Sequence, residues 1–249
     1  MAKKRLWIPA SLTLAGVGCG FASLIFLVQG RYVAGMLWMA LAVIFDGIDG
    51  KVASMLDARS ELGAVLDSKA DVVSFAVLPG VAAYLFFHRS PDAGLLTNVA
   101  AWTTGVGYTC AGIFREVRFM VTQVDRTRGE GFIGLPIAPP AGLIVAMMAL
   151  TNLFPHTLYR PTWQVIYFMI VVLCAYLMTG STINYLRWGG RAIAVQALAA
   201  VAVGVAAHVA LGTPGTFLAV YFIAFCSIYI VFHPTLVLFR RTAGVRESA

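Results

Sequence analysis

Long apolar runs separated by short polar segments make up most of this chain. Each run is close to the roughly 20 residues that a helix needs to cross the hydrocarbon core of a bilayer. This pattern predicts an all-α fold, a polytopic membrane helix bundle of about eight transmembrane helices. The predicted spans are Leu6–Val28, Val33–Ala53, Gly63–Phe87, Leu95–Phe114, Leu135–Phe154, Trp163–Ile183, Ile193–Leu211 and Phe217–Phe239.

The first apolar run is expected to remain in the protein as a span. From Leu6 to Val28 it is longer than the ~7–15 residues of a signal-peptide core, and no A-x-A-like cleavage site follows it. Composition agrees, because 60% of the residues are hydrophobic, 12% are charged and the mean hydropathy is +0.84. We expect a single integral membrane domain over residues 1–249.

Basic residues gather in alternate connections and so predict the orientation. By the positive-inside rule, these connections and both termini face the cytoplasm. We expect a multi-pass protein of the inner cell membrane with its active site at the cytoplasmic face. The net charge of +7 fits anionic lipid and not nucleic acid, because no aromatic or basic reading element accompanies it. The residues are Lys3, Lys4, Arg5, Lys51, Arg59, Arg115, Arg118, Arg126, Arg128, Arg187, Arg191, Arg240, Arg241 and Arg246.

The cysteines and the last two spans suggest packing and no chemistry. The cysteines lie far apart inside apolar runs, unlike a disulfide framework or a zinc site. His208 has no second His, Cys or carboxylate nearby, so it is expected to pack between helices. We assign the last two spans to packing or dimer contacts, which leaves a homodimer open. The cysteines are Cys19, Cys110, Cys174 and Cys226.

Acidic residues concentrate between positions 46 and 71. Asp46 and Asp49 are three residues apart near the end of the second span, and Asp67 and Asp71 are four apart near the start of the third. These spacings put each pair on one helix face. A short link joins the two helices as antiparallel neighbours, so the four carboxylates are expected at one depth, just inside the membrane. Asp57 belongs to the link, as a turn or N-cap residue.

Four such carboxylates require positive charge, since burying them unpaired would cost several kcal/mol each. Oxygen ligands without His or Cys favour Mg²⁺ or Mn²⁺, with Ca²⁺ as a further option, and four carboxylates are enough for two ions. The alternative is that they pair with Lys51, Arg59 and Lys69. Intramembrane carboxylates are more often functional, so a divalent metal site is the first functional prediction.

Three glycines accompany the acidic residues. Gly50 and Gly63 lie beside the predicted cluster, where a missing side chain lets a large ligand approach the backbone. Gly47 is expected to serve close packing between helices instead.

The spacing D-x-x-D-G-x-x-A followed by G-x-x-x-D-x-x-x-D resembles the signature of the CDP-alcohol phosphotransferases. The resemblance implies a six-helix catalytic core over about residues 6–183, with two extra helices at about 193–239. One signature position departs: the family usually has Arg where this chain has Ser54, and Lys51 and Arg59 are the nearest substitutes. The positions that match are Asp46, Asp49, Gly50, Ala53, Gly63, Asp67 and Asp71.

The resemblance also implies roles for these residues. Asp46, Asp49 and Asp67 would hold one metal ion, Asp67 and Asp71 would hold or adjoin a second, and Asp71 would be the general base for an acceptor hydroxyl. The ions would bind the diphosphate of a CDP-linked lipid, CDP-diacylglycerol, and assist the departure of CMP. Gly50, Ala53, Ser54 and Gly63 are the expected substrate-binding positions around them.

Within the family, residues 67–75 resemble the D-S-L-A-D-V-V-S-F pattern of phosphatidylserine synthases, apart from Lys69. Gly16 stands where that group usually has Asn. The resemblance implies L-serine as the acceptor, and Arg115 and Arg118 are the expected partners of its carboxylate or of phosphate. Ser74 could orient the acceptor, although helix packing is the more usual role of such a serine.

Three alternatives stay open. Another acceptor alcohol, glycerol phosphate or an inositol phosphate, would leave the signature unchanged. A divalent-cation transporter would also carry intramembrane aspartates, but along the full depth of its spans. Ser54 leaves room for a catalytically silent homologue.

Overall fold

The structure is a computed structural model that describes residues 2–90, 94–122, 132–154, 160–180, 184–185, 190–212 and 214–242. Within these ranges the chain is helical, apart from a short antiparallel pair of strands, β1 (Phe132–Ile133) and β2 (Asn184–Tyr185). The predicted helical class is confirmed. The helices are α1 (Ala2–Val28), α2 (Tyr32–Met55), α3 (Glu61–Asp71), η1 (Val72–Val77), α4 (Leu78–His88), α5 (Leu95–Thr122), α6 (Ala138–Leu153), α8 (Pro161–Thr179), α9 (Gly190–Leu211) and α10 (Pro214–Thr242).

Every predicted span overlaps a helix, and the differences lie at the ends. The fourth span was expected to end at Phe114, but α5 continues for two more turns to Thr122. The sixth was expected to reach Ile183, but α8 ends at Thr179 and residues 181–183 lie outside the described part. The third span is one continuous rod made of α3, η1 and α4.

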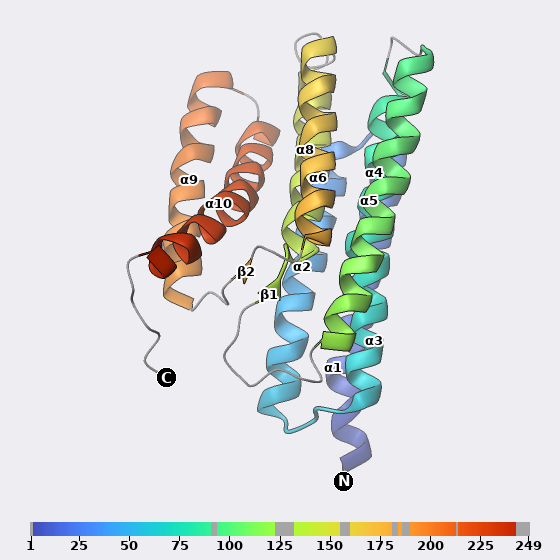
Figure 1. Cartoon of the computed structure of the whole chain (residues 1–249), viewed down its shortest axis with the longest axis vertical. Helices are drawn as coiled ribbons and strands as arrows, with labels where there is room; N and C mark the ends of the chain where they lie inside the picture. The colour runs from blue at the N-terminus through green and yellow to red at the C-terminus, as the bar shows by residue number, and fades with distance from the viewer. Residues whose placement is uncertain are drawn as a thin grey trace.

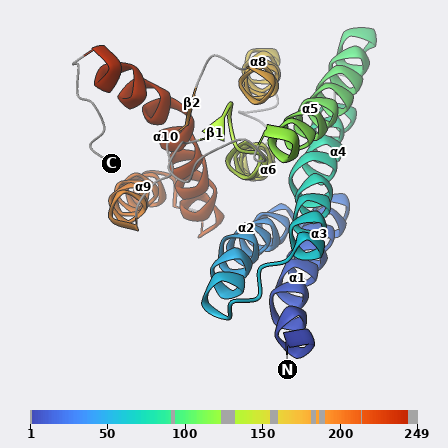
Figure 2. The same ribbon diagram turned by 60° about the horizontal axis from the view of Figure 1, so that its bottom comes forward.

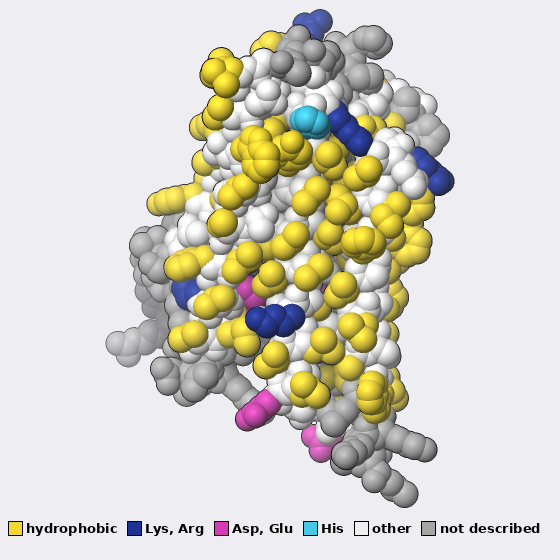
Figure 3. All heavy atoms as spheres, turned by 90° about the vertical axis from the view of Figure 1, so that its right-hand side faces the viewer, with side chains coloured by type: hydrophobic (Ala, Val, Ile, Leu, Met, Phe, Trp, Pro, Cys, Tyr) yellow, Lys and Arg dark blue, Asp and Glu magenta, His cyan; other side chains and the backbone are white. Residues whose placement is uncertain are grey.

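Four segments of the described chain are long and apolar enough to cross a membrane. They are Trp7–Val28, Tyr32–Met55, Glu61–His88 and Pro161–Thr179. Three further apolar helices in these ranges are shorter, so the predicted number of eight spans is confirmed only in part. Figure 3 shows hydrophobic side chains over most of the face on the α4–α5 side, as a lipid-facing surface requires.

The helices run roughly along one axis, with α9 and α10 set to one side (Figure 1). Helix α1 packs against α2, α4 packs against α5, and α9 packs against α10. Helix α6 lies at the centre of the bundle, in contact with α2, α4, α8 and α10 (Figure 2). Its residues from Pro140 to Ala149 are all buried, because neighbours cover it on every side.

The contact between α4 and α5 depends on glycine. A β-carbon on Gly80 would lie 2.8 Å from the carbonyl oxygen of Gly105 on α5. Next to this crossing, the Tyr108 hydroxyl donates a hydrogen bond of 3.1 Å to the carbonyl oxygen of Phe75. Small residues at a membrane helix interface allow such a close approach of two backbones.

A π-helix follows Asp71 directly. It covers Val72–Val77, between the α-helical segments α3 and α4. Short π-helical turns inside α-helices are frequent at functional sites, because the extra residue per turn re-aims nearby side chains. Ser74 and Phe75 are buried within this turn.

Candidate metal centre

The link between α2 and α3 brings the two acidic helix ends together. Helix α2 ends at Met55, and α3 begins after its N-cap residue Ser60, whose side chain accepts a 3.0 Å hydrogen bond from the backbone N–H of Gly63. Asp57 adopts a left-handed backbone conformation with φ of 51°. Asp57 is therefore a turn residue of the link, as one of the two predictions had it, and the N-cap is Ser60.

Three carboxylates from the two helices converge. Within the described residues, Asp46, Asp49 and Asp67 each offer an oxygen, and these oxygens all lie within 4.8 Å of one another. Asp49 is buried, with 4% of its surface exposed, and the other two are half-buried. The predicted convergence of these three residues is confirmed.

Helix α1 supplies a partner for the most buried of the three. The hydroxyl of Thr13 donates a 2.6 Å hydrogen bond to Oδ2 of Asp49. Thr13 itself is buried, with 8% of its surface exposed. A hydrogen bond to an ionised carboxylate is strong and helps to hold that side chain in one rotamer.

Asp71 lies beside this triad and not within it. Its carboxyl group is close enough to that of Asp46 for the two to interact electrostatically. A narrow cavity of about 10 Å³ connects all four aspartates. A space of that size holds about one water molecule, so it suits an ion and not a substrate headgroup. Its other lining residues are Thr13, Gly16, Val17, Ala42, Ala70, Ser74 and Phe75.

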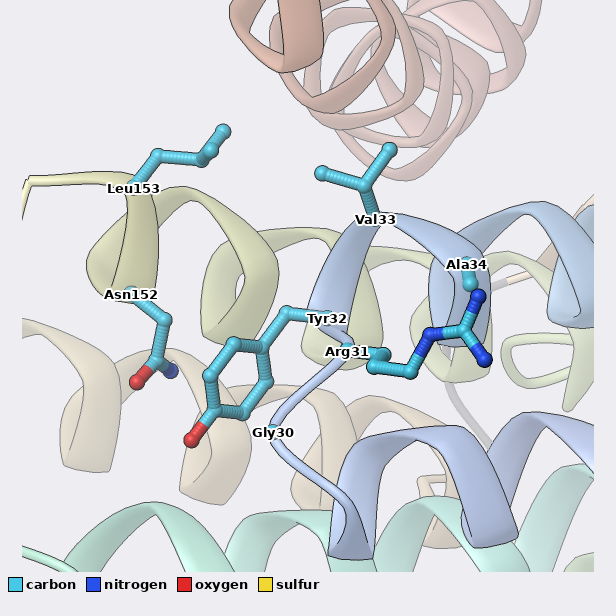
Figure 4. Close-up of a pocket in the computed structure, with 7 residues that line it drawn as sticks. All are labelled: Gly30, Arg31, Tyr32, Val33, Ala34, Asn152 and Leu153. Carbon is cyan, nitrogen blue, oxygen red and sulfur yellow. The ribbon is translucent and has the colours of Figure 1, made fainter.

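A larger pocket lies at the other end of α2 and is unrelated to this site. Its volume is about 390 Å³, and its lining comes from the α1–α2 turn and the end of α6. Figure 4 shows Tyr32 and Asn152 side by side there, with Arg31 pointing away from them. None of the described residues that line it is acidic.

Helix α5 brings a buried ion pair to the metal centre. Nη1 of Arg115 donates a 2.6 Å hydrogen bond to Oε2 of Glu116, and the two residues are 4% and 2% exposed. The Glu116 carboxylate is close enough to interact electrostatically with Asp46, Asp67 and Asp71. Arg115 was a predicted site residue, but Glu116 was not.

Arg118 is engaged by the end of another helix. Its two Nη atoms donate hydrogen bonds to the carbonyl oxygens of Thr179 (2.6 Å) and Met178 (2.8 Å), in the last turn of α8. A cation there satisfies carbonyl groups that have no partner within the helix and complements the helix dipole. Gly134, with φ of 75°, passes beside this guanidinium. This contact gives Arg118 a structural role, and its predicted contact with substrate remains a prediction.

The three glycines near the cluster differ in their surroundings. A β-carbon on Gly50 would meet no described atom within 4 Å, so space lies open beside this backbone. The same holds for Gly47, so the prediction that it packs against a neighbouring helix is wrong for the described residues. A β-carbon on Gly63 would lie 3.1 Å from the Oγ atom of Ser60, so glycine makes room here for the N-cap.

The last turn of α2 carries the departure from the family signature. Ser54 is exposed, and Ala53 beside it is half-buried. The two cations nearest to Ser54 in the sequence, Lys51 and Arg59, are also exposed. The positive charge that the signature Arg would supply therefore has candidate replacements at the surface of the same helix end and link.

The donor set fits a divalent cation. Two oxygens on opposite sides of an ion are roughly 4.2 Å apart for Mg²⁺ and about 4.8 Å apart for Ca²⁺, given their usual bond lengths. The three converging aspartate oxygens are no more than 4.8 Å from one another, so they can all reach one such ion. Carboxylate oxygen without His or Cys is the set that Mg²⁺, Mn²⁺ and Ca²⁺ prefer. The three aspartates together could therefore hold one such ion.

Sequence reasoning missed Glu116 and the role of Thr13. A carboxylate close to an apolar span often indicates a functional site. Glu116, however, stands beside Arg115, in a segment whose charged residues were attributed to the cytoplasmic orientation of the connection. The bond from Thr13 joins residues 36 positions apart, and no local pattern announces it.

Known proteins resemble this chain over the same region. Residues 6–179 match the family model described as CDP-alcohol phosphatidyltransferase. Three relatives are named CDP-diacylglycerol–serine O-phosphatidyltransferase. The one from Mycobacterium bovis is 29% identical over 160 residues, which cover 63% of this chain and 54% of the relative. The one from Bacillus subtilis is 29% identical over 146 residues, covering 58% and 76%. The one from Helicobacter pylori is 28% identical over 177 residues, covering 71% and 70%.

The chain spans about half the length of the mycobacterial relatives it matches. The family model, in contrast, covers more than half of this chain, from the first residues of α1 to the end of α8. The acidic helix pair, the Thr13 contact and the buried pair on α5 all lie within that stretch. The chain therefore belongs to the CDP-alcohol phosphatidyltransferase family.

Proposed function

We propose that this protein transfers the phosphatidyl group of CDP-diacylglycerol to the hydroxyl group of L-serine and releases CMP. The observation that carries the proposal is the convergence of Asp46, Asp49 and Asp67 within 4.8 Å, with Asp71 beside them. Membership of the family supports the donor, and the similarity to serine O-phosphatidyltransferases supports the acceptor.

Asp46, Asp49 and Asp67 would hold a Mg²⁺ or Mn²⁺ ion, and Asp67 with Asp71 would adjoin a second. When bound, these ions neutralise the negative charge that develops on the diphosphate as CMP leaves. Thr13 holds Asp49 in place for this task. The open space beside Gly50 would admit the diphosphate to the end of α2, with Ala53, Ser54 and Gly63 around it.

Asp71 would act as the general base. The serine hydroxyl oxygen attacks the phosphorus atom that carries the diacylglycerol, and the bond from that phosphorus to the bridging oxygen of CMP breaks. The hydroxyl proton passes to the Asp71 carboxylate, and the bond electrons leave with CMP. An aliphatic hydroxyl has a pKa far above neutral and needs such a base in the transition state. Asp71 is suited to it, because it borders the cavity without belonging to the converging triad.

The proposal also includes a position for the site in the membrane and a role for the last two helices. The site lies at the end of the bundle that carries the α2–α3 link and the N-terminus (Figure 1), and we place this end at the cytoplasmic face of the inner membrane. The catalytic core would comprise residues 6–183. Helices α9 and α10 would serve packing, since α10 covers one side of α6, or the contacts of a homodimer.

A panel of acceptors tests the reaction. The purified protein, given labelled CDP-diacylglycerol and Mg²⁺ or Mn²⁺, should release CMP with L-serine, and chelation of the metal should abolish the release. L-Serine should be preferred over glycerol phosphate and inositol phosphate. Release of CMP with glycerol phosphate but not with serine would exclude serine as the acceptor. A complete lack of CMP release with any acceptor would favour a catalytically silent homologue.

A further inference from the structure

The pair formed by Arg115 and Glu116 has an unusual geometry. Neighbouring residues on a helix point about 100° apart and do not normally face each other. Here the two side chains meet at 2.6 Å, and each is less than 5% exposed. The Arg115 guanidinium also lies over the ring of Phe119, 4.7 Å from its centroid. The guanidinium and the carboxylate are therefore buried together at the surface of α5.

That place borders the catalytic site. Tyr108, Glu116 and Met120 share one face of α5, at multiples of four residues. Tyr108 bonds to the carbonyl oxygen of Phe75, and the Sδ atom of Met120 lies 2.9 Å from the hydroxyl of Ser68. Glu116 lies between these two contacts, so it faces the stretch from Ser68 to Phe75. That stretch contains Asp71, whose carboxyl group Glu116 repels.

The charges explain what this pair could bind. A fifth carboxylate is not needed for the metal ions, and a buried ion pair is often no more stable than apolar residues of the same volume. A ligand that carries one carboxylate and one ammonium group can exchange with the pair without changing the local net charge. Arg115 would take the carboxylate, and Glu116 would take the ammonium group. An acceptor that carries phosphate and no ammonium group would instead meet repulsion from Glu116.

We propose that Glu116 is a specificity-determining residue that binds the ammonium group of a zwitterionic amino alcohol, while its partner Arg115 binds the carboxylate. This inference rests on the proposed function, because it assigns the acceptor subsite of that reaction.

Kinetics with trimmed acceptors test the assignment. The Glu116→Gln variant should raise KM for L-serine by roughly tenfold to a hundredfold, which is the usual loss for a hydrogen bond between charged groups. Its kcat should change much less. For 3-hydroxypropionate, which lacks the ammonium group, the variant should perform as well as the wild type or better. Glu116→Asp, which keeps the charge, should restore selectivity for L-serine.

Controls separate a role in binding from a role in folding. Mn²⁺ binding, followed by electron paramagnetic resonance, should be unchanged in Glu116→Gln. If that variant does not fold, the paired variant Arg115→Leu/Glu116→Leu removes both charges together and should lose the preference for L-serine over 3-hydroxypropionate. A variant that affects both acceptors equally, or that keeps the wild-type KM for serine, would overturn the proposal. Failure of the wild type to release CMP with any acceptor would overturn the proposed function as well.

Discussion

Asp71 differs from the other site aspartates in its contacts, and this difference can be tested. Its carboxyl group interacts electrostatically with that of Asp46 but is not one of the three whose oxygens converge. The Asp71→Asn variant keeps the size of the side chain and can still hydrogen-bond to Asp46, but it cannot accept the proton. We expect turnover to fall by a factor of roughly 10² to 10⁴, the usual contribution of a general base. Binding of Mn²⁺ and of CDP-diacylglycerol should persist, as measured on the purified variant.

The matched control is Asp57→Asn, which makes the same chemical change in the exposed link. Its CMP release should stay close to that of the wild type, because Asp57 is a turn residue outside the cavity. Near-normal turnover in Asp71→Asn would exclude Asp71 as the base. Complete loss of activity in Asp57→Asn would show that Asp57 belongs to the active site and not only to the link.

Thr13 tests the importance of positioning a metal ligand. Thr13→Val keeps the shape of the side chain and removes the 2.6 Å bond to Asp49. Loss of a group that orients a metal ligand typically weakens metal affinity about 10-fold to 100-fold, so the Mn²⁺ titration should shift by that factor. Thr13→Ser should recover most of the affinity. Ser11→Ala is the control on the same helix, since the exposed Ser11 hydroxyl donates its 2.8 Å hydrogen bond to the carbonyl oxygen of Ile8 within α1. Equal affinity in Thr13→Val and the wild type would refute the positioning role.

At the scale of helices, regular spacing made much of the site predictable. Asp46 with Asp49 and Asp67 with Asp71 fall on facing sides of α2 and α3, because helical periodicity and a short link leave little freedom. For the same reason, the apolar runs located the long helices of the described residues. The π-helix after Asp71 was not predictable, since a single extra residue per turn barely disturbs a hydrophobic pattern.

Contacts between distant helices could not be read from local patterns. Thr13 reaches Asp49 and Glu116 reaches the acidic cluster only once α1 and α5 are packed against α2 and α3. Gly47 shows the opposite error, because a glycine beside a packed helix and one beside open space look alike in a sequence. Tertiary packing decides all three cases.

The close crossing of α4 and α5 predicts that a larger side chain at Gly80 destabilises the fold. Gly80→Val would place side-chain atoms within 2.8 Å of the Gly105 carbonyl oxygen, so the helices must separate. We expect a loss of about 1–3 kcal/mol in stability, the usual cost of overpacking. Gly107→Ala on α5 is the control, because no described atom lies within 4 Å of the added carbon. It should be neutral or slightly stabilising. Thermal unfolding in detergent would measure both, and equal melting temperatures would contradict the close crossing.

The whole molecule has two ends with different chemistry. At one end lie the α2–α3 link and the acidic cluster, and at the other lie the α1–α2 turn and the pocket of Figure 4. Helix α6 joins the layers between them and is buried on all sides. The donor lipid lies in the membrane with its nucleotide headgroup in water, and the small polar acceptor comes from water. The compartment that the acidic end faces therefore decides whether the proposed reaction can occur in the cell.

Cysteine labelling can determine that compartment. Asp57→Cys would mark the acidic end, and Gly94→Cys, before the start of α5, would mark the opposite end; both positions are exposed. In intact spheroplasts, a membrane-impermeant maleimide should label Gly94→Cys. It should label Asp57→Cys only after the membrane is permeabilised. The unmodified chain is the control, because its one exposed described cysteine, Cys110, lies within α5. Labelling of Asp57→Cys from outside would contradict the proposed cytoplasmic position of the site.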